Sequence, residues 1–427
     1  MTSLPARLPL TSAIALASLI PVGALAAEDT VTPESVVSHY ADVAHATYAD
    51  SLAAARALDE RIDALLEAPS AETLSAAREA WLEARVPYQQ SEVFRFGNPV
   101  VDDWEGQLNA WPLDEGMIDY VASDDYRHEL GNAGATANIV ANTSIEIGGK
   151  TLDVSEITPE LLADLNEAGG SEANVATGYH ALEFLLWGQD LNGFDSGNGE
   201  RPASDYLTGD DCTNGHCDRR RSYLDAASDL LVSDLEWMVA QWSTDQQDNY
   251  RQTLLAQPAQ EGLRRMLFGM GSLSLGELAG ERLKVALEAN SYEDEHDCFS
   301  DNTHNSHFYN GQGIQNVYLG EYERRDGSVM EGPSPSDLLA QQDAELDTQL
   351  REQLEATMAE LGDLKAAAEA ESSPMAFDMM IAPGNEQGAN IINEAILALV
   401  MQTGSIEKAA GALGVNSLQS DDAGHNF

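Results

Sequence analysis

Basic side chains are scarce in this sequence. Its 427 residues include 22 lysines and arginines against 72 aspartates and glutamates, for a formal net charge of −50 and a pI near 4.1. Nucleic acid is excluded as a partner, because its binding depends on lysine and arginine side chains that neutralise phosphates. The acids are spread along the whole chain, and no Asp-x-Asp-x-Asp-Gly loop typical of calcium sites occurs. We therefore interpret the charge as a solvated surface adapted to high salt.

Long apolar runs are absent beyond the amino terminus. The apolar stretch from Leu8 to Val22 follows Arg7, and Ala24–Ala26 then supplies the small-x-small pattern that signal peptidases cleave. Polar residues interrupt this stretch, whereas a membrane-spanning helix needs about 20 apolar residues. We expect a signal peptide over residues 1–26. The mature chain is then exported to the periplasm or cell envelope and has no transmembrane segment.

Cysteine is rare as well, with three residues in the chain. Cys212 and Cys217 flank a short run of turn-forming residues, and an oxidising periplasm favours a disulfide between them. The alternative is a zinc knuckle that includes His216, but it would have only two thiolates and one histidine. Cys298 is left over, either as a buried thiol or as a soft metal ligand.

Helical periodicity dominates the remaining sequence, and alternating β patterns are nearly absent. The expected helices cover Pro33–Ala68, Ala71–Val86, Pro159–Glu167, Val175–Trp187, Arg219–Trp242, Pro258–Leu287, Ser336–Ala370 and Asn390–Leu413. The segment Ser144–Lys150 alone has a β-like pattern and predicts a small hairpin. Glycines at helical spacing predict that one helix packs very closely on a neighbour; they are Gly269, Gly271, Gly276 and Gly280.

The length of the chain predicts two domains, since one hydrophobic core seldom serves more than about 200 residues. The loop Asn192–Gly215, rich in glycine, aspartate and asparagine, marks the boundary. We expect an N-terminal helical bundle over residues 27–195 and a C-terminal helical bundle over residues 196–427. The two halves hold similar numbers of expected helices, which suggests an internal duplication. The predicted fold is therefore all-α, with two bundles and a cleft between them.

The strongest candidate for chemistry lies in the expected helix Val175–Trp187. His180 and Glu183 are three residues apart and so share one helix face. A pair of this kind can hold a metal ion, as Glu-x-x-His pairs do in helical di-iron proteins. The residues Phe184–Trp187 are apolar, so the pair is expected in dry surroundings, where burial without a partner is costly. The alternative is that the two side chains only hydrogen-bond each other and a loop.

A second candidate cluster is the segment from Glu295 to His307. It holds three histidines, three acids and a thiol within thirteen residues. Asp301 and His304 again have the spacing of one helix face. Alternatively, Ser300 or Asp301 caps a helix that begins at Asn302. Ligation and capping are equally compatible with this segment.

A third group combines charge with aromatic rings. Glu92 and Arg95 have the spacing of a helical salt bridge, and Phe96 follows them. This mixture suits a cleft between domains better than an open surface. Trp111 and Asp114 belong to a polar and aromatic turn that is expected to line the same cleft.

Four motifs, taken together and in this order, resemble the imelysin family, with its branch of iron-regulated protein A and insulin-cleaving metallopeptidase-like proteins. They are Asn109-Ala-Trp-Pro-Leu-Asp114, Gly178-x-His180-x-x-Glu183, Phe299-Ser300-Asp301-Asn302-Thr303-His304 and Asn316-Val-Tyr-Leu-Gly320. The resemblance spans residues 33–413. It implies two helical bundles, a site between them at His180 and Glu183, and a role in bacterial iron acquisition. It also implies Glu92, Asp301 and His304 as neighbours of that site.

Three functions follow as hypotheses. We favour an exported protein that binds a divalent metal, iron first and zinc as the alternative, with envelope iron-transport components as partners. Its expected ligands are His180, Glu183, Glu92, Asp301 and His304, surrounded by Arg95, Ser300, Asp114 and Trp111. A metallopeptidase is the second hypothesis, although a third ligand and a general base are not identified. The third is a peptide or haem module that uses an aromatic cleft at Trp104, Trp111 and Trp187.

Overall fold

The computed structural model describes residues 1, 30–122, 126, 128, 131–415 and 418–427. The predicted signal peptide, with cleavage after Ala26, lies outside the described residues. Residues 31–427 group together as one unit, and every element named below belongs to it. Within the described ranges, no helix combines the length and the apolar character that a membrane span requires.

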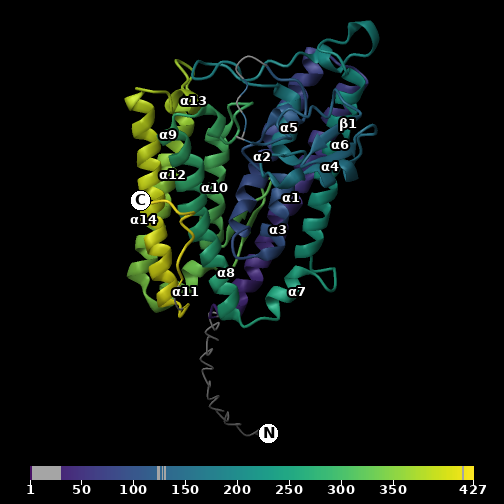
Figure 1. The fold of residues 1–427 in the computed structure, drawn as a ribbon. Coiled ribbons are helices and arrows are strands. Elements are labelled where there is room, and N and C mark those ends of the chain that lie inside the picture. The colour runs from purple at the N-terminus through teal and green to yellow at the C-terminus, as the bar shows by residue number, and fades with distance from the viewer. Residues whose placement is uncertain (2–29, 123–125, 127, 129–130, 416–417) are drawn as a thin grey trace. The chain divides into compact units, whose positions relative to one another are not determined.

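Helices make up most of this unit, and the predicted all-α class is confirmed (Figure 1). The longer α-helices are α1 (Pro33–Glu67), α2 (Ala71–Ser91), α3 (Pro99–Leu108), α5 (Gly178–Trp187), α6 (Cys217–Trp242), α8 (Ala259–Ser272), α10 (Thr303–Leu319), α11 (Pro335–Gln342), α12 (Ala344–Ala368) and α14 (Glu386–Ala412). The shorter ones are α4 (Pro159–Leu165), α7 (Tyr250–Leu255), α9 (Ala286–Ala289) and α13 (Phe377–Met380). The segment η6 (Leu273–Val285) is a π-helix that joins α8 to α9.

Side-chain caps explain where the first two helices begin. At α1 the hydroxyl of Thr32 accepts from the backbone N–H of Ser35, and Pro33 occupies the first turn, where its missing N–H is not needed. At α2 the hydroxyl of Ser70 accepts from the backbone N–H of Thr73 in the same way. Both caps are reciprocal capping boxes, so these helix starts are fixed locally by sequence.

Several predicted helix boundaries are wrong, including the following three. Pro87 does not end α2, which continues to Ser91 with the proline buried inside it. The predicted helix Ser336–Ala370 is two helices, because Asp343 ends α11 and its carboxylate caps α12. The helix predicted from Val175 begins instead at Gly178, whose φ of 77° lies outside the helical region.

The helices run side by side in two groups (Figure 1). In the first group, α1 packs against α2 and α6, and α5 packs against α2 and α6. In the second, α12 and η6 pack against α14, and α12 also packs against α10. The contact of α10 with α2 joins the groups. These contacts place α6 beside α1, whereas the predicted boundary at residues 195 and 196 separates them. The two-domain division and the duplication stay predictions.

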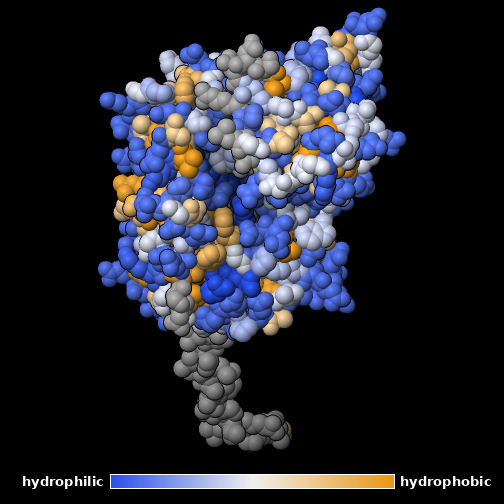
Figure 2. Space-filling view, in the orientation of Figure 1, coloured by the Kyte–Doolittle hydropathy of each residue, from blue (hydrophilic) through white to orange (hydrophobic). Residues whose placement is uncertain are grey.

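Two small antiparallel hairpins interrupt the helices. Strand β1 (Ser144–Ile147) pairs with β2 (Lys150–Asp153), with Ser144 opposite Asp153, which confirms the predicted hairpin. Strand β3 (Glu321–Glu323) pairs with β4 (Val329–Glu331) and was not predicted. The face of the molecule seen in Figure 2 is mostly hydrophilic, as the net charge of −50 requires.

The glycines of α8 and η6 confirm the predicted close packing. A Cβ atom added at Gly269 would lie 2.6 Å from the backbone oxygen of Val93. One at Gly276 would lie 2.8 Å from the backbone oxygen of Asp421, in the C-terminal segment. Gly269 therefore packs against the segment that follows α2, and Gly276 packs against the C-terminal segment.

Candidate functional site

The helix α5 fixes the positions of His180 and Glu183. Every residue of α5 is buried, with His180 1% exposed and Glu183 0% exposed. A Cβ atom at Gly178 would lie 2.2 Å from the backbone oxygen of Leu108, so only glycine allows this helix start to approach α3 so closely. The predicted dry environment of the pair is thus present in the structure.

His180 and Glu183 contact each other directly, with 2.9 Å between Nδ1 and Oε2. The other carboxylate oxygen, Oε1, accepts from the backbone N–H of Ser300 at 3.0 Å and from its hydroxyl at 2.6 Å. Burial, followed by the nearby charge of Asp297, raises the pKa of Glu183 well above its usual range. Burial, followed by the charge of Arg85, lowers the pKa of His180 well below its usual range. Both shifts favour the neutral form of the group.

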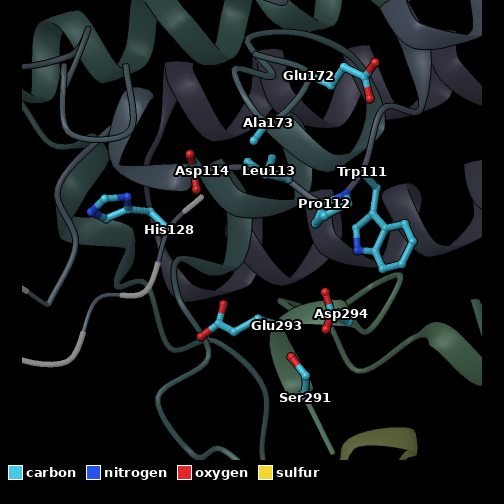
Figure 3. A pocket seen from close by; sticks show the side chains of 10 residues that line it. All are labelled: Trp111, Pro112, Leu113, Asp114, His128, Glu172, Ala173, Ser291, Glu293 and Asp294. Carbon is cyan, nitrogen blue, oxygen red and sulfur yellow. The ribbon is translucent and has the colours of Figure 1, made fainter. Parts of the chain in front are cut away.

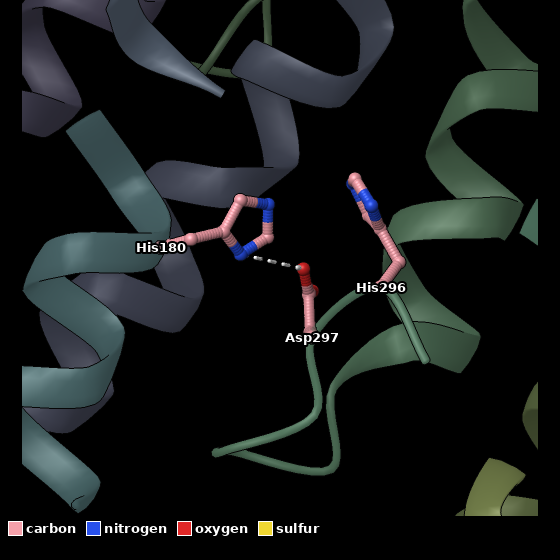
Figure 4. A group of neighbouring side chains, drawn as sticks. All are labelled: His180, His296 and Asp297. Carbon is pink, nitrogen blue, oxygen red and sulfur yellow. Dashed lines mark ion pairs between the residues drawn. The ribbon is translucent and has the colours of Figure 1, made fainter. Parts of the chain in front are cut away.

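His296 and Asp297 complete a buried trio with His180 (Figure 4). One ligand atom from each residue lies within 4.8 Å of the other two. His180 Nδ1 is 4.0 Å from Asp297 Oδ1, and the two imidazole rings meet edge to face with 4.8 Å between centroids. His180 Nε2 and His296 Nδ1 are buried without a hydrogen-bond partner. Orphaned imidazole nitrogens of this kind are costly unless a ligand or water satisfies them.

Arg85 is the positive charge of this site. Its Nη2 donates to Asp297 Oδ1 at 2.8 Å and lies 3.1 Å from His296 Nε2. Its Nη1 donates to Asn109 Oδ1 at 2.6 Å. The guanidinium is 1% exposed, and three aromatic rings surround it at 5.1–5.8 Å from their centroids. They belong to Trp81, Tyr88 and Tyr179.

Asp297 is held on both of its oxygens. Oδ1 pairs with Arg85, whereas Oδ2 accepts from Asn302 Nδ2 at 3.0 Å and from the hydroxyl of Ser306. Its backbone N–H donates to the hydroxyl of Thr303 at 2.9 Å. These hydrogen bonds to residues at the start of α10 hold the carboxylate of Asp297 in one orientation, as a metal ligand requires.

Glu92 belongs to a neighbouring network and not to the trio. Its carboxylate receives two hydrogen bonds from Arg282, at 2.5 and 3.1 Å, and one each from Asn109 and Asn310 at 2.8 Å. Burial raises the pKa of Glu92, but Arg282 more than offsets this, so the net pKa lies below its usual value. Asn109 connects the two networks, because its amide bridges Glu92 and Arg85.

Asp301 and His304 have other partners. Helix α10 begins at Thr303, so Asp301, with a φ of 57°, precedes the helix and does not share a helical face with His304. Burial, followed by the charge of Asp378, raises the pKa of Asp301 to about 7. His304 Nε2 lies 3.0 Å from Asn305 Nδ2 and 3.4 Å from a carboxylate oxygen of Glu369. Ligation by Glu92, Asp301 or His304 stays a prediction.

Trp111 contacts the trio through His296 and also lines a cavity of about 470 Å³, whose lining residues are drawn in Figure 3. Its ring meets that of His296 edge to face at 5.2 Å, and its Nε1 donates to the backbone oxygen of Glu295 at 2.8 Å. The cavity is lined by Trp111, Pro112, Leu113, Asp114, His128, Glu172, Ala173, Ser291, Glu293 and Asp294. The predicted aromatic cleft is not formed, because Trp104 packs against Tyr48 and Trp187 against Trp81.

The remaining predicted neighbours lie at different distances from the trio. Ser300 is in direct contact with Glu183. Asp114 lines the cavity and accepts from Asn132 at 2.6 Å. Arg95 forms ion pairs away from the trio, with Asp102, Glu105 and Glu277 at 3.3–3.6 Å.

The predicted disulfide between Cys212 and Cys217 is confirmed. Because the two sulfur atoms are bonded to each other, they are not thiolate ligands, and a zinc knuckle with His216 does not form. Cys298 is a free cysteine and is only partly buried. Burial, followed by the charge of Glu183, raises the pKa of its thiol well above the usual value.

Sequence reasoning missed His296, Asp297 and Arg85. The first two lie in the recognised cluster of histidines and acids, but Asp301 and His304 were preferred for their helical spacing. His307, in the same cluster, is fully buried with neither ring nitrogen hydrogen-bonded, and its ring stacks on that of His296 at 6.4 Å. Arg85 carried no motif, and its position depends on the contact of α2 with the segment before α10.

The fold and the site together define an all-helical protein with a buried centre of imidazoles, carboxyl groups and one guanidinium. The family model described as Imelysin, a peptidase family, matches residues 44–406, and the chain belongs to this family. A crystal structure of a putative iron-regulated protein A precursor from Parabacteroides distasonis is similar, with a TM-score of 0.62 at 18% identity, over 88% of this chain and 94% of that one. An imelysin-like protein from Psychrobacter arcticus has a TM-score of 0.57 at 16% identity, over 90% and 97% of the two chains.

One relative is similar in sequence over a short region. Iron-regulated protein A of Synechococcus elongatus is 31% identical over 84 residues, which is 20% of this chain. The match spans about a quarter (24%) of that protein's length. The structural likenesses establish the fold, and the name of this relative describes that protein alone.

Proposed function

We propose that this imelysin-family protein binds a divalent metal ion as cargo at His180, His296 and Asp297, with Glu183 as a further ligand. Iron is the first candidate and zinc the second, because imidazole and carboxylate donors suit both ions. The supporting observation is the buried trio, in which one ligand atom of each residue lies within 4.8 Å of the other two and His180 Nε2 has no partner. Neutral imidazoles can bind a metal without first losing a proton.

The proposed setting is the cell envelope, in bacterial iron acquisition. The names of the relatives from Synechococcus and Parabacteroides support this role, together with the disulfide, which suits an oxidising compartment. Envelope iron-transport components are the proposed partners. The signal peptide over residues 1–26 remains part of this proposal.

A titration with Mn²⁺, Zn²⁺ and, without oxygen, Fe²⁺ tests the metal site. The protein without residues 1–26 should bind one of these ions, and His296→Ala should weaken binding by at least about tenfold, the loss typical of disturbed metal shells. His39→Ala is the matched control, since His39 is a buried histidine whose Nε2 pairs with the backbone oxygen of Gly320 at 2.9 Å. Wild-type protein that binds none of the ions at 1 mM, or equal binding by His296→Ala, would exclude the proposed site.

The metallopeptidase hypothesis has one observation in its favour, the contact of His180 with the Glu183 carboxyl group, whose pKa burial raises. Burial argues against it, because a peptide bond must reach the metal and its water, and both residues are at most 1% exposed. Hydrolysis of an unfolded protein that is abolished by a chelator and by Glu183→Ala would establish it. Metal binding without such hydrolysis would leave the protein as a binder.

A further inference from the structure

Arg85 already occupies the atoms that a metal ion would use. Its Nη2 lies 2.8 Å from Asp297 Oδ1 and 3.1 Å from His296 Nε2. The imidazole Nε2 atom has a single lone pair, so it cannot accept from a guanidinium and bind a metal at once. The carboxylate oxygen has room for both, but then two cations share one buried negative charge.

We propose that Arg85 is a built-in competitor of the metal, which neutralises Asp297 in the metal-free protein and withdraws from His296 and Asp297 when a metal binds. This inference rests on the proposed function, because it describes the control of the same site. A competing internal cation lowers the affinity of the site. It therefore favours reversible capture of a cargo ion over the permanent retention of a cofactor.

The surroundings of Arg85 offer the guanidinium stabilising contacts that do not involve the trio. Its Nη1 bond to Asn109 does not involve the trio and can persist. The rings of Trp81, Tyr88 and Tyr179 lie within 5.8 Å of the guanidinium carbon, and aromatic faces stabilise a desolvated cation. A small rotation of the guanidinium therefore frees His296 and Asp297 for the metal, while Asn109 and the aromatic rings still stabilise its positive charge.

The charge count also favours a divalent ion over a trivalent one. Arg85 contributes one positive charge, whereas Asp297 and an ionised Glu183 contribute two negative charges. A divalent ion brings the sum to one positive charge and a trivalent ion to two. Because uncompensated charge is costly in a buried site, the divalent ion is preferred while Arg85 remains inside.

The substitution Arg85→Met tests the inference. Without metal the variant should be less stable than the wild type, because Asp297 is left buried without its cation. Its affinity for Mn²⁺ should rise by about tenfold or more, since the ion now supplies the missing charge. The shift of the thermal midpoint on adding Mn²⁺ should be larger than for the wild type.

Arg220→Met is the matched control. Arg220 is also a buried arginine, 1% exposed, with its Nε 2.6 Å from Asp119 Oδ2 and its guanidinium over the ring of Tyr120. This variant should lose stability in a similar way, but its Mn²⁺ affinity should equal that of the wild type. A gain of affinity in both variants would mean that loosening of the fold, and not Arg85 itself, controls the site, and it would overturn the inference.

The outcomes separate the inference from the proposed function. Wild-type protein that binds Mn²⁺ while Arg85→Met binds it equally or more weakly overturns the inference and leaves the metal site standing. No binding by wild type or variant overturns the proposed function. If Arg85→Met does not fold without metal, Mn²⁺ should restore its helical circular dichroism. If Arg85→Met stays unfolded even with Mn²⁺, the variant Arg85→Lys takes its place in the test. Its side chain is shorter, so its affinity for Mn²⁺ should be higher than that of the wild type. An unchanged affinity would overturn the inference.

Discussion

His180 Nδ1 lies 2.9 Å from Glu183 Oε2, so one turn of α5 brings an imidazole and a carboxyl group into direct contact. Burial lowers the pKa of His180 and raises that of Glu183, so burial favours the neutral form of each group. The same contact occupies the Nδ1 atom of His180. Its unpartnered Nε2 is left as the atom most accessible to a ligand.

The raised pKa of Glu183 predicts the pH dependence of metal binding. A carboxyl group with a raised pKa keeps its proton above its usual pKa of 4.5, so Glu183 must release a proton before it binds a metal as a carboxylate. Affinity should increase with pH from about 4.5 up to the raised pKa of Glu183 and then level off. Calorimetry in two buffers of different ionisation enthalpy measures this proton.

Glu183→Gln supplies the comparison for this prediction. The amide keeps the shape of the protonated acid and has no proton to release. The variant should bind metal more weakly than the wild type at pH 8, with a flatter pH profile. A wild-type profile that stays flat over the same range would mean that Glu183 is not a ligand.

The buried pair of Arg282 and Glu92 predicts a large loss of stability when it is broken. Arg282 is 1% exposed and Glu92 2% exposed by side chain, with 2.5 Å between the closest atoms. Arg282→Met should lower the free energy of unfolding by about 3–5 kcal/mol, because Glu92 is left buried without its cation. Glu92→Gln added to this variant should recover part of the loss. Urea unfolding measures all three proteins.

An exposed pair serves as the control for the same measurement. Arg264 lies 2.8 Å from Glu261, with side-chain exposures of 45% and 33%. Arg264→Met should cost less than about 1 kcal/mol, because solvent already screens both charges. Equal costs at the two positions would mean that burial does not control the strength of these pairs.

Local signals in the sequence were sufficient for many of the helices, although not for α3, α7 or α10, and for one half of the site. Thr32 and Ser70 cap α1 and α2 through bonds that span three residues, and His180 and Glu183 meet within one helical turn. The pairing of these residues with His296 spans more than a hundred residues, and no local periodicity encodes it. The cluster around His296 was visible in the sequence, but helical spacing pointed to Asp301 and His304.

The start of α10 explains why Asp301 and His304 do not share a helix face. Asn302 is the N-cap and Asp301 has a φ of 57°, so the chain before Thr303 turns back instead of continuing a helix. This turn leaves Asp297 hydrogen-bonded to the first residues of α10. The trio therefore includes His296 and Asp297, which precede this turn.

The carboxyl group of Asp301 predicts a stability that falls with rising pH. Its folded pKa of about 7 lies above the ordinary value of 3.8, so the folded state holds a proton that the unfolded state has released. The associated stability is complete below about pH 4 and is lost as the pH rises through about 7. Asp301→Asn should therefore stabilise the protein by about 1 kcal/mol at pH 8 and by less at pH 5.

The backbone conformation at Asp301 accommodates asparagine. Asparagine tolerates the φ of 57° as well as aspartate does, so no strain is added. Guanidinium unfolding at pH 5 and pH 8, with a chelator present, measures the effect. Destabilisation at pH 8 would instead show that the charged form of Asp301 has a partner such as a cation.

The C-terminal segment predicts opposite effects for two helical glycines. A Cβ atom at Gly276 would lie 2.8 Å from the backbone oxygen of Asp421, whereas one at Gly404, inside α14, would meet no atom within 4 Å. Gly404→Ala should stabilise the protein by about 1 kcal/mol, the usual difference between the two residues in a helix. Gly276→Ala should destabilise it, because a backbone atom cannot move aside as a side chain can. In a chain that ends at Gln419, which lacks Asp421, the cost of Gly276→Ala should disappear. Persistence of that cost would show that the π-helix itself, and not the C-terminal segment, requires the glycine.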